Sequence, residues 1–261
     1  MRISIVGAGR VATHLAKILF SQHQIVEVFS PTLLHAQQLA KQVQASAVAR
    51  IEDLDCTVDL LLIAVSDRAI STCIQQLAQQ FNQTLIVHTS GSTHLDILTE
   101  HYARAGVFYP LQTFSLDCEI DWAQTPLFIE TARPEDLAML KGIADGLSQR
   151  IYQYNSAQRL SLHLAAVFAC NFSNYCYDMA AQITTAEQVD FSLLHPLILE
   201  TAKKATQNSP EKMQTGPAVR QDQHILAMHQ QMLEQAQRPD LEAVYKRMSE
   251  EILKRHHPEA L

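Results

Sequence analysis

Two glycines near the start of the chain have the type and spacing of a phosphate-binding turn. Gly7 and Gly9 follow the apolar run at residues 3–6, and Ala12 occupies the third position of the pattern. Glycine allows a sharp turn and lets a phosphate approach the backbone amides at a helix N-terminus, where the helix dipole favours negative charge. A small residue at the third position keeps the helix close to the strand. We therefore expect a dinucleotide pyrophosphate to bind here, at Gly7, Gly9, Arg10, Val11 and Ala12.

The residues after this turn complete a strand–helix–strand unit. Residues 11–20 are apolar at helical spacing, and residues 25–29 form a second apolar run. The unit has the length of a right-handed parallel crossover. This context favours a dinucleotide site over a chance pair of glycines. The alternative is a domain that has kept the turn and lost the ligand.

The end of the second strand indicates which dinucleotide fits. In NAD-binding domains, an acidic residue at this point usually holds the ribose hydroxyls. Here the chain has Ser30, Pro31 and Thr32 instead. No carboxylate repels a 2′-phosphate, the hydroxyls of Ser30 and Thr32 can donate to it, and Arg10 or His35 can supply a positive charge. We expect NADP as the cofactor, with NAD as the alternative.

Two further strands end in residues that can contact a ligand. Val65 and Ser66 end or follow the apolar run at residues 59–65, and His88 and Ser90 lie at the end of the run at residues 85–89. The carboxyl ends of strands in such sheets line the ligand crevice. We expect Val65, Ser66 and His88 to contact the cofactor, and Ser90 the substrate. Helix capping and turn formation are the alternative roles.

A predicted helix at residues 157–183 is apolar almost all round and carries one polar stripe. Buried polar groups cost about 1–3 kcal/mol each unless they are paired, so the stripe needs partners or a wet cleft. A cleft facing the nicotinamide would supply both, whereas pairing with backbone groups or with another subunit is the alternative. The stripe consists of Arg159, His163, Asn171, Asn174 and Asp178.

Arg220 lies in a turn-rich segment at residues 215–222. A guanidinium binds a carboxylate through two parallel hydrogen bonds, which suits a keto acid or hydroxy acid. We expect Arg220 to hold the substrate carboxylate. A helix start at Asp222, with Arg220 paired to an acidic neighbour, is the alternative.

The composition excludes several classes of protein. The chain has 261 residues, is 47% apolar and has a formal net charge of −7, which argues against nucleic acid or an anionic membrane as partner. Its five cysteines are odd in number and contain no C-x-x-C pair, so neither a disulfide framework nor a metal site is expected. Glycines interrupt the N-terminal apolar run, and no run is long enough to span a membrane, so we expect a cytoplasmic protein.

The apolar pattern predicts an α/β fold followed by helices alone. Strands are expected at residues 45–51, 59–65, 85–89, 106–113, 126–130 and 150–154, and helices at 33–43, 69–80, 95–104 and 137–147. After residue 154 the strand signals stop. We therefore predict two domains, at residues 1–154 and 155–261, and a homodimer in which the long apolar helix is buried against a partner chain.

Six short motifs in order resemble one family over nearly the whole chain. They are the glycine turn, Ala64–Asp67, His88–Gly91, Pro110–Leu111, Leu162–Phe172 and Thr215–Arg220. The chain resembles proteins that pair a Rossmann-like NADP-binding domain with a helical C-terminal domain of unknown function. These are similar to the 6-phosphogluconate dehydrogenase group, which includes ketopantoate reductase and the deazaflavin-linked NADP reductases.

The resemblance implies a doubly wound Rossmann domain followed by an all-α domain, and an NADP-dependent oxidoreductase. Hydroxyacid dehydrogenases of the wider group carry a catalytic Lys and an Asn on the first helix after the Rossmann domain; this chain has His163 in the comparable stretch and Asn171 two turns later. Tyr109 stands where the family often has a His before Pro-Leu.

We therefore expect hydride transfer between NADP and a small carbonyl or hydroxy-acid substrate bound between the domains. Imidazole can donate or accept a proton near neutral pH, so His163 is the expected acid or base. Asn171 is expected to orient the substrate, with Asn174 beside it. The alternatives are a deazaflavin-linked NADP reductase and a dinucleotide-binding or regulatory protein without catalysis.

Overall fold

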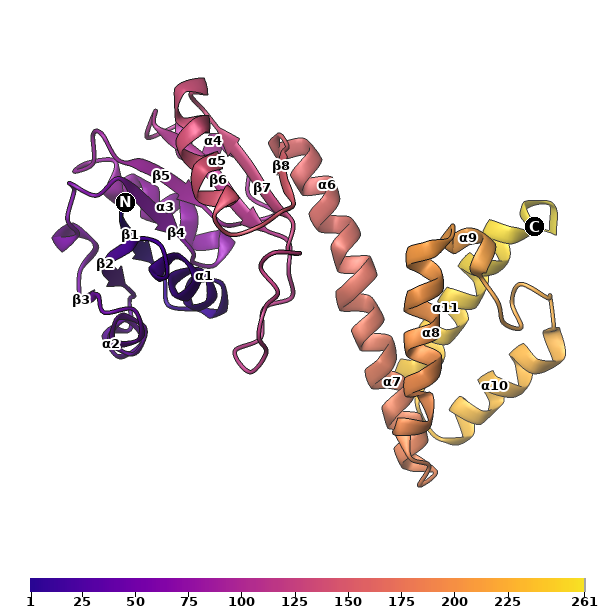
Figure 1. Cartoon of the computed structure of the whole chain (residues 1–261). Helices are drawn as coiled ribbons and strands as arrows, with labels where there is room; N and C mark the ends of the chain where they lie inside the picture. Colours follow the sequence, from indigo (N-terminus) through magenta and orange to yellow (C-terminus); the bar gives the residue numbers. More distant parts are fainter. Residues whose placement is uncertain (261) are drawn as a thin grey trace. The chain divides into compact units, whose positions relative to one another are not determined.

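The protein consists of a sheet-containing part and a helical part (Figure 1). The computed structural model describes residues 1–260 and separates into two compact units, Met1–Asn171 and Phe172–Leu261. The expected α/β fold followed by helices is confirmed. The sheet has eight strands in the order β3-β2-β1-β4-β5-β6-β7-β8, and all neighbours are parallel except β6 and β7. The strands are β1 (Arg2–Val6), β2 (Gln24–Phe29), β3 (Ser46–Val48), β4 (Leu60–Ile63), β5 (Leu85–His88), β6 (Ala105–Pro110), β7 (Leu127–Thr131) and β8 (Ile151–Gln153).

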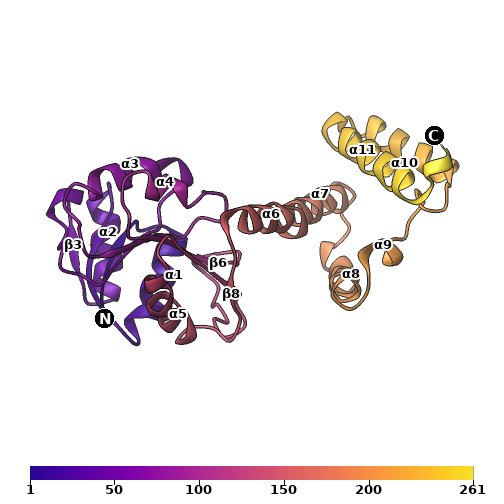
Figure 2. The ribbon, with the colours of Figure 1, turned by 90° about the horizontal axis from the view of Figure 1, so that it is seen from above.

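Helices cover both faces of this sheet, which is why its central strands are continuously apolar. Every residue of β4 is buried; Leu60 and Leu62 face one core, Leu61 and Ile63 the other. Figure 2 shows α1 and α5 on one side of the sheet and α3 and α4 on the other, and α2 packs in the same core as α1. These helices are α1 (Arg10–Phe20), α2 (Leu33–Gln42), α3 (Asp67–Leu77), α4 (Asp96–Thr99) and α5 (Leu137–Asp145).

Helix α4 is shorter than the helix expected at residues 95–104. Helix α4 ends early because the side chains of Tyr102 and Arg104, which follow it, bind residues outside this segment. The buried Tyr102 donates its hydroxyl hydrogen to the backbone oxygen of Thr84 at 2.7 Å, and Arg104 pairs with Asp136 at 2.7 Å. Tertiary contacts thus override a helical pattern in the sequence.

The chain after β8 is helical. It begins with α6 (Ser156–Ala166), passes through a six-residue π-helix, η3 (Val167–Phe172), and continues as α7 (Ser173–Ala186). In the second unit, Arg238 donates a hydrogen bond to Gln182 of α7 at 2.7 Å, which ties the start of α11 to α7. The remaining helices are α8 (His195–Gln207), α9 (Pro210–Met213), α10 (Gln223–Gln235) and α11 (Pro239–His256).

The change from strands to helices lies close to the predicted domain boundary, between Gln153 and Ser156. Helix α6 nevertheless belongs to the compact unit that contains the sheet. The division at residues 154 and 155 stays a prediction, as do the homodimer and the cytoplasmic location. Within residues 1–260, no helix combines the length and the apolar character that a membrane crossing requires.

The loop after β1 passes directly against the loop after β4. Gly7 has φ of +123°, and a Cβ atom there would overlap the backbone oxygen of Ala64. Gly9 has an extended backbone, and a Cβ atom there would meet no atom within 4 Å. Only the first glycine is therefore required by the fold itself.

We expect Gly7→Ala to lower the free energy of unfolding by at least about 2 kcal/mol, because the new methyl group meets backbone and the φ value is unfavourable. Gly9→Ala is the matched control and should cost less than about 1 kcal/mol. Urea unfolding followed by circular dichroism measures both. Equal stability of the two variants would contradict the assigned backbone contact.

Candidate functional site

The strand order reverses between β1 and β4, and the loops that follow them leave in opposite directions. Open α/β sheets bind ligands in the crevice that forms at such a point. A cavity of about 610 Å³ occupies this position, and we call it the main cavity. It is lined mainly by residues 7–11, 29–31, 64–67 and 89–91, together with Tyr109, Pro110 and His163.

One end of the main cavity is the glycine turn, which suits a phosphate group. Gly9 is the N-cap of α1, no side chain caps this helix, and its first turn contains no acidic residue. The backbone amides and the positive end of the helix dipole therefore face the cavity, and no acidic side chain of the first turn competes for them. The open space above Gly9 leaves room for a pyrophosphate.

A second cavity of about 560 Å³ shares Gly9, Arg10 and Ser30 with the main cavity. We call it the side cavity. Lys17 and His35 also line it, and no acidic residue does. Arg10 and Lys17 are exposed and lie on α1, while His35 is exposed on α2. This arrangement can hold an additional phosphate near the end of β2.

The other end of the main cavity holds a tyrosine–histidine pair. The hydroxyl of Tyr109, on β6, lies 3.1 Å from Nδ1 of His163, on α6, and the rings meet edge to face. Burial raises the pKa of Tyr109 to about 12, with a further increase from Asp67 and an opposing effect of Arg159. Tyr109 therefore keeps its proton at neutral pH and can donate it.

Gly91 makes room for this pair. A Cβ atom at Gly91 would lie 2.5 Å from Nδ1 of His163 and 2.6 Å from Cζ of Tyr109. The loop after β5 can therefore approach the pair only with a glycine at this position.

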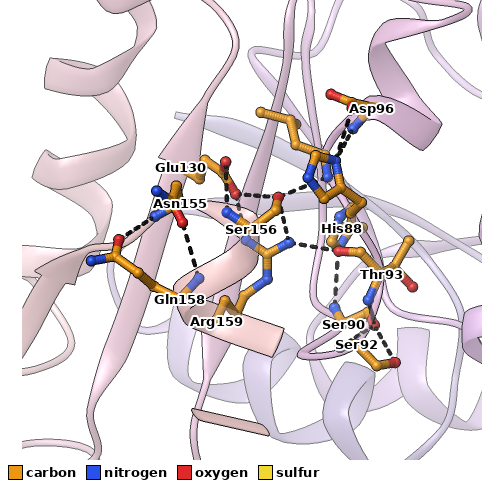
Figure 3. Close-up of polar contacts among 12 residues, drawn as sticks. His88, Ser90, Ser92, Thr93, Asp96, Glu130, Asn155, Ser156, Gln158 and Arg159 are labelled. Carbon is orange, nitrogen blue, oxygen red and sulfur yellow. Dashed lines mark hydrogen bonds and ion pairs between the residues drawn. The ribbon is translucent and has the colours of Figure 1, made fainter. Parts of the chain in front are cut away.

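A buried ion pair holds α6 against the sheet (Figure 3). Arg159 is 1% exposed and binds Glu130 of β7 and the backbone oxygen of Thr93. Ser156 donates its backbone N–H and its hydroxyl hydrogen to Glu130, at 3.0 and 2.8 Å. Because His163 follows Arg159 by about one helical turn, this anchor sets the position of His163 beside Tyr109.

His88 lies beneath the main cavity and does not line it. Its Nδ1 accepts a hydrogen bond from the backbone N–H of Ser90 at 3.1 Å, and its ring is fully buried. Burial lowers the pKa of His88 to about 3, and the positive charge of Arg159 contributes to this decrease. A neutral His88 therefore holds the loop that carries Ser90 and Gly91.

A third cavity, of about 440 Å³, meets the main cavity at Tyr109, Gln112 and His163. We call it the apolar cavity because side chains of α6 and η3 supply most of its lining, and these are mainly aliphatic. The tyrosine–histidine pair thus lies at the boundary of two cavities.

Comparison with protein families gives two matches. Residues 1–112 match the Rossmann-like domain, and residues 125–252 match the domain of unknown function DUF2520. Among solved structures, a candidate NADP oxidoreductase from Bacteroides fragilis is 39% identical, covers 97% of this chain and 98% of its own, and has a TM-score of 0.90. The chain belongs to this family of Rossmann-like proteins with a DUF2520 domain.

More distant structures share the fold. The protein TM1727 from Thermotoga maritima is 21% identical with a TM-score of 0.71, over 99% of this chain and 100% of its own. An imine reductase from Myxococcus stipitatus, in complex with NADP+, is 16% identical with a TM-score of 0.71, over 97% and 93%. Among curated proteins, no sequence matches this member of the DUF2520 family.

The structure brings most of the predicted site residues together. Ala12 is buried against the sheet, as the close packing of α1 requires, and Asn171 lines the apolar cavity. Thr32 lines neither the main cavity nor the side cavity. The residues that line the main cavity are Gly7, Gly9, Arg10, Val11, Ser30, Val65, Ser66, Ser90 and His163.

Two predicted residues belong to the second compact unit. Asn174 lies on α7 and Arg220 follows the turn at Gly216, and both are exposed. Their roles toward a substrate stay predictions. Asp222 is the N-cap of α10 and accepts a hydrogen bond from the backbone N–H of Ile225 at 3.2 Å, so a helix does start there, as the alternative interpretation of this segment has it.

Three residues that line the cavities are not among those predicted from the sequence to act there: Tyr109, Gln112 and Lys17. Lys17 had a detectable signal, because it lies two turns after Arg10 and so projects from a similar side of the helix. Tyr109 had none, because its partner is 54 residues away in the chain.

We expect His88 to make the protein sensitive to acid. The folded pKa is about 3 and the unfolded pKa is near 6.5, so stability falls as the pH decreases below about 6.5, where the unfolded chain binds the extra proton. The control is His88→Asn, whose amide oxygen can still accept the hydrogen bond from Ser90. Between pH 7 and pH 5, the unfolding equilibrium constant of the unmodified protein should rise roughly 25-fold more than that of this variant. Urea titrations at both pH values measure this ratio; an unchanged ratio would refute the assigned neutral state.

Proposed function

We propose that this protein is an NADP-dependent oxidoreductase that transfers a hydride between nicotinamide and a small carbonyl or hydroxy compound. One observation carries the proposal: a single cavity joins the glycine turn to the Tyr109–His163 pair. A dinucleotide whose pyrophosphate bound at Gly9 would extend along the carboxyl ends of the strands, and the pair lies at the far end of that path.

The cofactor proposal rests on the fit of the residues present. The uncapped start of α1 and the open space at Gly9 suit a pyrophosphate. Arg10, Lys17 and His35 around the side cavity suit the 2′-phosphate that distinguishes NADP from NAD. The Bacteroides fragilis relative, a candidate NADP oxidoreductase, supports the same choice.

The chemistry divides between the cofactor and the chain. When bound, NADPH would supply a hydride to the carbonyl carbon and become NADP+, while the oxygen gains an electron pair and takes a proton. Tyr109 is the proposed proton donor because its hydroxyl, which is protonated at neutral pH, belongs to a residue that lines the main cavity and lies 3.1 Å from Nδ1 of His163. His163 lies within hydrogen-bond distance and would return a proton to Tyr109, or donate directly.

The expected roles of Asn171, Asn174 and Arg220 complete the proposal. Asn171 lines the apolar cavity next to the pair and would orient the substrate. Arg220 would hold a carboxylate if the substrate is an acid. Binding of the substrate between the two domains stays a prediction.

Tyr109→Phe should lower kcat/KM for carbonyl reduction about 100-fold or more, because it removes a proton donor and keeps the ring. The measurement is NADPH oxidation over a panel of small carbonyl compounds, with NADPH affinity determined alongside. Tyr102→Phe is the matched control, since that hydroxyl binds Thr84 in the core and not the cavity. Equal turnover of the two variants would rule out the assigned role of Tyr109, whereas loss of NADPH binding would indicate a structural one.

Lys17→Gln should weaken NADPH binding about tenfold and leave NADH binding unchanged, because only NADPH carries the 2′-phosphate. Lys41→Gln is the control. It also removes one positive charge, but Lys41 lies on α2 and does not line the side cavity. Calorimetric titration with both nucleotides gives the two ratios. A parallel loss for NADPH and NADH would contradict the assignment of the side cavity.

A further inference from the structure

The apolar cavity is placed to receive the part of a substrate that does not react. Tyr109 and His163 line both this cavity and the main cavity. A compound in the apolar cavity can therefore present one atom to the pair while the dinucleotide occupies the main cavity. A volume of about 440 Å³ lies within the ordinary range for small-molecule sites.

The lining of this cavity selects against charge. No Lys, Arg, Asp or Glu contributes to it. A carboxylate placed there would therefore meet no cation, whereas an aliphatic group would contact an apolar lining. The aliphatic lining comes from Leu111, Leu162, Ala165, Ala166, Val167 and Ala169.

The polar groups of the cavity can hold one neutral carbonyl group. Besides the pair, they are Gln112, Thr113 and Asn171. The Gln112 side-chain oxygen already accepts the backbone N–H of Thr113 at 2.8 Å, which leaves its NH2 group to donate. The amide of Asn171 supplies a second neutral donor. Donors without formal charge suit a ketone or aldehyde oxygen better than a carboxylate.

The backbone of the helix is irregular at the same place. Residues Val167–Phe172 form a π-helix, and four of them line the cavity: Val167, Ala169, Cys170 and Asn171. π-Helical turns within α-helices are frequent at functional sites. The small side chains of Ala165, Ala166 and Ala169 on this wall keep the cavity open.

We propose that the substrate is a neutral carbonyl compound with an aliphatic or ring substituent, and that this substituent binds in the apolar cavity. The inference rests on the proposed oxidoreductase function and narrows its substrate class. A neutral substrate of this kind differs from a keto acid whose carboxylate is held by Arg220.

The first test compares methyl ketones of four to eight carbons with 2-oxo acids of the same length, as substrates for NADPH oxidation. Each added methylene should raise kcat/KM about fourfold for the ketones, because it leaves water for an aliphatic lining. At eight carbons the ketone should exceed the 2-oxo acid at least tenfold. A preference for the acids, or no dependence on chain length, would overturn the proposal.

The second test fills the cavity. Ala166→Phe should lower kcat/KM for the eight-carbon ketone at least tenfold and change that for the four-carbon ketone less than about threefold. Ala157→Phe places the same side chain at an exposed position of α6 that does not line the cavity, and should change neither value. NADPH affinity and thermal stability of Ala166→Phe should equal those of the control. An equal effect on both ketones would overturn the proposal.

A binding measurement separates this inference from the proposed function. NADP+-loaded protein is titrated calorimetrically with the matching secondary alcohols and 2-hydroxy acids, which requires no turnover. Alcohol affinity that rises with chain length, and that is lost in Ala166→Phe, supports binding in the apolar cavity. If this binding is observed but no compound is reduced, only the oxidoreductase proposal fails. Tighter binding of the hydroxy acids would refute the neutral substrate while leaving the oxidoreductase proposal intact.

Discussion

The site depends on the buried ion pair between Arg159 and Glu130. A guanidinium that is 1% exposed is stable only if its charge is compensated, and Glu130, Ser156 and the backbone of Thr93 supply this compensation. The pair joins the first helix after the sheet to β7 and to the loop after β5. It therefore fixes α6, which carries His163, against β7 and the loop after β5, and α6 belongs to the same compact unit as the sheet.

Around this anchor, each part of the site has a separate physical cause. Reversal of the strand order opens the crevice, and two glycines allow the chain to pass there: Gly7 against the loop after β4, and Gly91 against the tyrosine–histidine pair. Burial lowers the pKa of His88 to about 3 and raises that of Tyr109 to about 12, so His88 is neutral and Tyr109 keeps its proton over a wide pH range. Arg10 and Lys17 lie around the side cavity, away from the tyrosine–histidine pair, so the proposed phosphate site and the proposed proton donor are separate.

The sequence allowed the first half of the site to be predicted because its residues are local. The glycine turn, the helix behind it and the apolar strands are encoded within short windows, and the fold follows from them. The second half could not be predicted in the same way. A polar stripe along residues 159–178 assumes one continuous α-helix, but the π-helix at Val167–Phe172 interrupts that periodicity. Arg159, one of the stripe residues, pairs with Glu130 and anchors α6. Tyr109 and His163 meet only through tertiary structure, and no pattern along the chain records such a contact.

In the proposed complex, one cavity brings the nicotinamide to the Tyr109–His163 pair. A crystal structure of the protein with NADPH tests it most directly. We expect the pyrophosphate at the backbone amides of residues 9–11. We also expect the nicotinamide ring close enough to the Tyr109 hydroxyl that a carbonyl group between them would contact both, at about 3–3.5 Å. A dinucleotide bound with its nicotinamide away from this pair, or bound outside the glycine turn, would contradict the proposed site.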